Sequence, residues 1–231
     1  MKPYVLALLV GLFPAVAVAQ TNPAAQAARA WRQQHERAIV DITVYGPRAE
    51  LHSGHYGNWA RNPALMLAQL LTSMKDDNGR VLVDRFYDGI EPLGAAEKRA
   101  IADAPDIDAA LMKELWLGST ENSPKRLIEL IALPSLNIRG MASSRVGDQA
   151  SNVIPASATA TIDMRLVKGM DRRQTEARLL AHVRKQGFFV VDTEPAADVR
   201  MSHPKVAKVT VGESRQQPPT FPPTGSSSHE T

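Results

Sequence analysis

Two histidines with three-residue spacing stand in the segment "ELHSGHYGNWARNP", immediately before an expected helix. Imidazole nitrogens bind metals and transfer protons near neutral pH, so His52 and His55 are the first candidates for chemistry. Glu50 is the only carboxylate near them. The H-x-x-H spacing would therefore hold zinc weakly, and we interpret His55 as an exposed loop histidine instead.

The rest of the sequence limits the available chemistry. The chain of 231 residues has six histidines, no cysteine, no His-x-Asp and no Glu-Glu pair. It therefore forms no disulfide or thiolate zinc site, and a site with two metal ions lacks its usual ligands. We find no nucleophilic serine motif, phosphate loop or dinucleotide fingerprint. A net charge of +3 without basic blocks argues against nucleic acid as a partner.

The N-terminus has the pattern of a secretory signal peptide over residues 1–19. Lys2 precedes an apolar run from Tyr4 to Val16, and Ala17-Val18-Ala19 forms an A-x-A cleavage site. The run is too short to span a membrane comfortably. We therefore expect a secreted or periplasmic protein with no membrane span after cleavage.

The expected elements begin with a helix at residues 20–40, followed by a β-branched strand at 41–46. Asn62 as N-cap and Pro63 in the first helical position predict the next helix, which ends at Asn78-Gly79. Residues 80–124 read as an insertion with short helices, and a further helix over 123–133 has Ser123 as its expected N-cap. Two strands are predicted over 135–143 and 156–167, a helix over 171–187, and a last strand over 188–195.

Without the insertion, these elements follow the order βαββαβ. That order predicts an α+β, ferredoxin-like two-layer sandwich, with a four-stranded antiparallel sheet and its helices on one face. The Pro-, Ser- and Gln-rich residues 200–231 are predicted to be a disordered, divergent tail.

Two stretches together resemble a known family. They are "YGPRAELHSGHYGNWARNPALMLAQLLTSMKDDNGRVLV" and "PSLNIRGM…SNVIPASATATIDMRLV". Both are similar to the dimerisation (lid) domain of M20-type metallopeptidases, the group of carnosinase-like dipeptidases, glutamate carboxypeptidases and succinyl-diaminopimelate desuccinylase. The resemblance covers Val44 to Pro195 and implies a lid domain over residues 41–199, with 20–40 as a remnant of the peptidase start.

The resemblance also implies roles for individual residues. His52 takes the place of the family histidine that reaches into a neighbouring subunit's active site, where it polarises the scissile carbonyl. Asn152 and Arg165 match positions that contact polar groups and the carboxylate of the substrate, and an arginine suits a carboxylate because it binds bidentately. The alternative for Arg165 is a sheet-surface arginine paired with Asp163.

In the family, two zinc or similar divalent ions lie in a catalytic domain that has no counterpart here, so no cofactor is expected in this chain. We expect a truncated lid domain, inactive alone, that forms a homodimer or pairs with intact M20 subunits acting on peptides or acyl-amino acids. Two alternatives remain: a non-catalytic regulatory module for such subunits, and an enzyme with unrecognised chemistry.

Overall fold

The computed structural model describes residues 36–212. The expected signal peptide, most of the expected helix at 20–40, and residues 213–231 lie outside this range. In chain order the elements are β1 (Arg37–Tyr45), β2 (Leu51–His52), α3 (Ser53–Tyr56), α4 (Pro63–Thr72), α5 (Ala95–Asp103), α6 (Asp108–Glu114), α7 (Leu127–Ile131), β3 (Ser135–Ala142), β4 (Val153–Ile154), β5 (Ser157–Arg165), α8 (Arg172–Lys185), β6 (Phe189–Val191), α9 (Ala197–Ser202) and β7 (Val206–Gly212).

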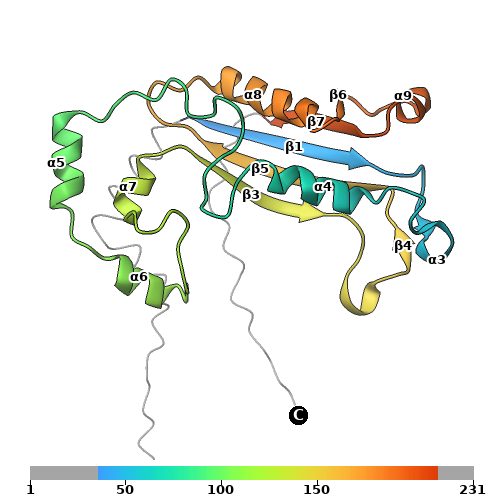
Figure 1. Ribbon diagram of the computed structural model, residues 1–231, viewed down its shortest axis with the longest axis horizontal. Coiled ribbons are helices and arrows are strands. Elements are labelled where there is room, and N and C mark those ends of the chain that lie inside the picture. Colours follow the sequence, from blue (N-terminus) through green and yellow to red (C-terminus); the bar gives the residue numbers. More distant parts are fainter. Residues whose placement is uncertain (1–35, 213–231) are drawn as a thin grey trace, which may run out of the picture.

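The main sheet has five strands in the order β3-β5-β1-β7-β6 (Figure 1). Its centre is the antiparallel pair β1 and β5, which runs from Arg37 opposite Arg165 to Tyr45 opposite Ser157. Side chains alternate between the two faces of a strand, and those on one face of this pair are buried. They are Ala38, Val40, Ile42, Val44, Ala158, Ala160, Ile162 and Met164.

Two helices, α4 and α8, cover that buried face. Leu67 and Leu70 of α4 join Leu179 and Val183 of α8 in the same hydrophobic cluster as the sheet residues. The predicted start of α4 is confirmed, because the Asn62 side chain accepts hydrogen bonds from two backbone amides and Pro63 occupies the first turn. A mainly antiparallel sheet with helices packed on one face confirms the predicted α+β class.

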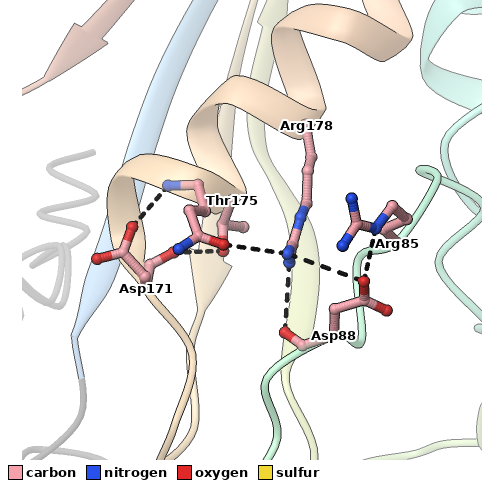
Figure 2. Close-up of polar contacts among 6 residues, drawn as sticks. Arg85, Asp88, Asp171, Thr175 and Arg178 are labelled. Atoms are coloured by element: carbon pink, nitrogen blue, oxygen red, sulfur yellow. Dashed lines mark hydrogen bonds and ion pairs between the residues drawn. The ribbon is translucent and has the colours of Figure 1, made fainter.

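The start of α8 also has the predicted form. The Asp171 side chain accepts from the amide of Gln174 at 2.7 Å, and the Thr175 hydroxyl donates to the Asp171 carbonyl at 2.9 Å. Figure 2 shows Arg178, one turn further along, reaching from α8 to the loop that contains Arg85 and Asp88. Its guanidinium donates to the Asp88 carbonyl at 3.3 Å, which ties the loop after α4 to the helix.

The four-stranded antiparallel sheet is not what the structure shows. The predicted last strand survives only as β6, a short edge strand that runs parallel to β7. The place beside β1 belongs to β7, which pairs with it from Ile39 opposite Gly212 to Tyr45 opposite Val206. β7 occupies the inner position because it buries Val206, Ala207 and Val209, whereas β6 has no fully buried residue.

Two predicted boundaries were therefore wrong. Residues 37–40 belong to β1 and not to the expected helix at 20–40, because Ala38 and Val40 must alternate with their neighbours to reach the core. Residues 200–212, expected in the disordered tail, contain the end of α9 and all of β7. Hydrogen bonding to β1 makes residues 206–212 a strand, although the composition of the tail predicted disorder.

The insertion lies at the end of the sheet opposite α3 and β4, where Figure 1 shows α5, α6 and α7. The helix predicted over 123–133 starts later, at Leu127. Two contacts set its start: the Asp108 carboxylate, from α6, accepts from the Leu127 amide at 2.7 Å, and the local Glu129 side chain accepts from the Arg126 amide at 2.8 Å. Within residues 36–212, no helix has the length and apolar character needed to cross a bilayer.

Candidate functional site at the His52 ribbon

A small two-stranded ribbon, β2 with β4, brings two of the predicted site residues together. His52 lies opposite Val153 in this pairing, and Leu51 lies opposite Ile154. The amide of Ser53 donates to the carbonyl of Asn152 at 2.9 Å. His52 and Asn152, which are 100 residues apart in the sequence, are thus neighbours at one end of the molecule, beside α3 (Figure 1).

The hydrogen bonds of His52 determine which ring nitrogen is available. His52 is the N-cap of α3, and its Nδ1 atom accepts from the amide of Gly54 at 3.1 Å. A neutral imidazole carries a single proton, so an accepting Nδ1 places that proton on Nε2. The side chain is exposed. His52 therefore presents a hydrogen-bond donor to whatever lies beyond the ribbon.

Close packing against Gly54 holds the ring of His52 in this position. A Cβ atom at residue 54 would lie 3.0 Å from Cε1 and 3.1 Å from Nδ1 of His52. Such contacts are tighter than ordinary van der Waals distances. A side chain at position 54 would therefore require the imidazole to shift by a few tenths of an ångström.

His55 lies in α3 and not in a loop, and its ring is beside that of His52, with the centroids 4.7 Å apart and the planes tilted by 34°. The side chain of His55 is exposed, as the sequence predicted. Among the described residues, no group of three or more His, Cys, Asp and Glu side chains is arranged to hold a metal ion. The histidine pair thus has no third ligand there.

Arg165 lies elsewhere, at the opposite end of β5. The eight residue steps from Ser157 to Arg165 span about 27 Å of strand. Its Nε atom donates to Asp163 at 3.1 Å, and Arg37 donates to the other oxygen of the same carboxylate at 2.8 Å. The pairing with Asp163 is the alternative that the sequence left open. Since the Arg165 side chain remains 38% exposed, its guanidinium can still contact a further group.

Sequence reasoning missed a groove beside the ribbon. It has a volume of about 700 Å³ and is lined by residues of the β1–β2 turn, the segment after α3, and α9, among them Leu51, Trp59, Arg61, Arg200, Met201 and His203. Trp59 and Met201 are 80% and 82% exposed. The signal that could have revealed β7 is the apolar alternation in "KVAKVTVG", residues 205–212, which lies within the segment predicted as tail.

A polar network attaches the segment before α9, which borders this groove, to the main sheet. The Tyr45 hydroxyl donates to Glu194 at 2.7 Å, and Lys208 pairs with the same carboxylate at 2.8 Å. Burial and the bond to Glu194 raise the pKa of the Tyr45 hydroxyl above its ordinary value. The hydrogen bond from Lys208 lowers the pKa of Glu194, which keeps that carboxylate charged. The network is therefore a fixed structural contact at neutral pH.

Comparison with known proteins shows which family the fold belongs to. A family model described as the peptidase dimerisation domain of M20 enzymes matches residues 35–188. The chain is 30% identical over 148 residues to a Cys-Gly metallodipeptidase of Schizosaccharomyces pombe, covering 63% of this chain and 31% of the relative. It is 29% identical to the Saccharomyces cerevisiae enzyme of the same name, covering 60% and 29%. The chain thus spans about a third of the length of these relatives.

Solved structures share the fold over a similar region. An M20 family metallo-carboxypeptidase from Sulfolobus solfataricus superposes with a TM-score of 0.59 at 26% identity, covering 66% of this chain and 41% of that one. Human carnosine dipeptidase 1 gives a TM-score of 0.62 at 20% identity, covering 76% and 36%. At that lower identity, the likeness shows the fold alone.

Proposed function

The chain belongs to the M20 peptidase dimerisation-domain family, and from this premise we propose that it is a lid module of an M20-type metallopeptidase, which pairs with a second subunit and presents His52 to it. The observation that carries the proposal is the ribbon. It places His52 and Asn152 together, with the Nε2–H of His52 directed away from its own helix cap.

The edge strand β3 is the proposed dimer contact. It lies at one side of the main sheet, and six of its eight residues are exposed. Ile138 and Met141 are 44% and 53% exposed, and a sheet edge offers unpaired backbone groups to another strand. A second copy of β3, related by a two-fold axis, would satisfy these groups and cover both side chains.

The separation of the three site residues supports two different roles in such a dimer. His52 and Asn152 lie at one end of the sheet, and Arg165 lies at the other. In an M20 enzyme assembled from such modules, one lid would therefore contribute to two active sites: its ribbon to that of the neighbouring subunit, and Arg165 to that of its own subunit's catalytic domain. There, Nε2–H of His52 donates to the oxygen on which charge develops during attack on a carbonyl, and Arg165 binds a substrate carboxylate.

M20 enzymes are metallopeptidases, and their reaction depends on divalent ions. The described residues do not fit such a centre, since they contain no converging group of three metal ligands. We therefore assign no step of the reaction to a metal in this module. The module holds two subunits together, donates a hydrogen bond from His52 to the substrate oxygen, and binds the substrate carboxylate through Arg165. The proposed substrates are dipeptides or acyl-amino acids with a free carboxylate.

Export is proposed as well. Lys2, the apolar run and Ala17-Val18-Ala19 support secretion or a periplasmic location. Mass spectrometry of the exported protein should find Gln20 as its first residue. A soluble product that retains Met1 would overturn this part of the proposal.

The proposed dimer can be tested directly because the chain has no cysteine. Ile138→Cys on β3 should give a disulfide-linked dimer under mild oxidation, whereas Phe189→Cys on the opposite edge should not. Phe189 is a matched control, being 41% exposed on an edge strand. Light scattering should show a dimer of the unmodified mature chain. A monomer at high micromolar concentration, or equal cross-linking at both edges, would overturn the proposal.

A further inference from the structure

The turn between β1 and β2 determines where the His52 ribbon points. The ribbon consists of two residue pairs, and so short a ladder cannot fix its own direction. Its direction depends on the two segments that connect it to the main sheet: residues 46–50 on the side of β1, and residues 155–156 on the side of β5. The amide of Gly46 donates to the carbonyl of Ala156 at 2.9 Å, which joins these two connections.

Arg200 of α9 holds the first connection through its backbone. A single guanidinium nitrogen, Nη2, donates to the carbonyl of Gly46 at 2.9 Å and to that of Pro47 at 2.8 Å. The guanidinium also lies over the ring of Tyr45, 5.2 Å from its centroid. Charge-assisted hydrogen bonds are stronger than neutral ones, and the cation over the aromatic face adds a further attraction. One side chain thus contacts three consecutive residues at the point where the chain leaves β1.

The helix that carries Arg200 is itself held against the sheet. Glu194, just before α9, binds both Tyr45 of β1 and Lys208 of β7. Because β7 pairs along β1, the segment on either side of α9 is anchored to the same central strand. Arg200 therefore extends from a fixed support. Leu51, which precedes His52 in β2, and Trp59 line the same groove as Arg200.

We propose that Arg200 is a positioning residue for His52. It touches neither His52 nor any substrate group. It acts by fixing the carbonyls of Gly46 and Pro47, and hence the angle at which the ribbon presents the Nε2–H donor. A donor serves an oxyanion only within a narrow range of positions, so a shift of about 1 Å at the ribbon matters. The inference rests on the proposed function, since positioning has a purpose only if His52 serves a neighbouring site.

Amide hydrogen exchange in the full mature chain, followed by NMR, tests this assignment. The Ser53 amide reports on the ribbon, and the Ile42 amide in the middle of β1 reports on the whole sheet. Arg200→Ala should make Ser53 exchange about tenfold faster, with Ile42 unchanged. Arg200→Lys retains the charge and one donating group, so its Ser53 amide should exchange faster than in the parent and more slowly than in Arg200→Ala. Arg173→Ala, at an exposed arginine of α8, is the matched control and should leave both rates unchanged.

Two results would overturn the assignment. One is a Ser53 rate in Arg200→Ala equal to that in Arg173→Ala. The other is an equal acceleration at Ser53 and Ile42, which would show that Arg200 stabilises the whole fold and not the ribbon. If Arg200→Ala does not fold, Arg200→Lys decides by the same comparison of Ser53 with Ile42. Light scattering on the same samples measures the proposed dimer independently. A failure of the dimer proposal can therefore be distinguished from a failure of the role assigned to Arg200.

Discussion

His182 of α8 and Ser73, the C-cap of α4, form a hydrogen bond of 2.9 Å between Nε2 and Oγ. The Ser73 hydroxyl donates to the carbonyl of Leu70 at 2.6 Å, so it accepts from His182. His182 is only 5% exposed, and its Nδ1 atom has no hydrogen-bond partner in the part of the chain that the structure describes. The spacing is that of a nucleophile and its base, but the serine proton is already used within α4. The pair therefore joins the two helices that cover the sheet.

This pair predicts that stability falls in mild acid. Burial lowers the pKa of His182 below its ordinary value; the charge of Asp84 opposes this shift, and that of Lys185 adds to it. With a lower pKa in the folded chain, the unfolded chain binds the proton more strongly. The stabilisation is thus complete above about pH 6.5, the ordinary value, and is lost as pH falls from there through the folded pKa.

Thermal unfolding of the parent and of His182→Gln, measured from pH 7.5 to pH 5, should show this loss. The parent Tm should fall across the window, and the variant should lose most of that dependence because it has no proton to bind at residue 182. His55→Gln, at an exposed histidine of α3, is the control and should follow the parent. Identical pH profiles for the parent and His182→Gln would contradict the prediction.

Gly54→Ala should disturb the His52 ring while leaving the fold intact. The new methyl group would lie about 3 Å from the imidazole and displace the ring from the Gly54 amide. The parent should show ¹⁵N imidazole shifts of the Nε2–H tautomer, and the variant should lose the shift that marks an accepting Nδ1. Gly118→Ala is the control, since a Cβ there meets nothing within 4 Å. A parent protein whose His52 lacks the shift of an accepting Nδ1 would refute the assigned hydrogen bond, and an unchanged shift in Gly54→Ala would contradict the predicted displacement of the ring.

Val209→Asp should be strongly destabilising because β7 is part of the core. Val209 is 5% exposed and lies opposite Ile42 in the sheet. Burying an unpaired carboxylate there should cost about 4 kcal/mol of unfolding free energy, measured by urea titration. Thr210→Lys, on the exposed neighbouring residue, places an opposite charge across from Asp41 and should change stability by less than about 1 kcal/mol. Equal, small effects of the two variants would support the disordered tail that composition predicted.

The mature chain alone should not hydrolyse peptides. Metallopeptidase chemistry requires a metal to acidify water and a base to accept its proton. One donor, His52, supplies about 3 kcal/mol, or roughly a hundredfold in rate, far below the 10⁶-fold or greater acceleration typical of enzymes. The test offers dipeptides and acyl-amino acids with zinc, manganese or cobalt. Metal-dependent turnover that His52→Ala abolishes would overturn the prediction.

Local signals determined much of this fold. Asn62-Pro63 and Asp171 predicted the starts of α4 and α8, because capping depends on side chains within a few residues. Strict alternation predicted β5, because one of its faces is buried along its whole length. The "HSG" motif and "SNVIP" identified His52 and Asn152 through family resemblance.

Tertiary structure determined the strand pairing and the strand boundaries, which local sequence signals do not contain. β7 is a strand because β1 has a second edge to satisfy, and β1 begins at Arg37 because β5 extends to Arg165 opposite it. Hydrogen bonds between distant strands set these limits, and no property of either segment alone records them. The same reason explains the site: the pairing of β2 with β4 joins His52 to Asn152, β5 carries Arg165 to the far end of the sheet, and the packing of α9 brings Arg200 onto the turn before the ribbon.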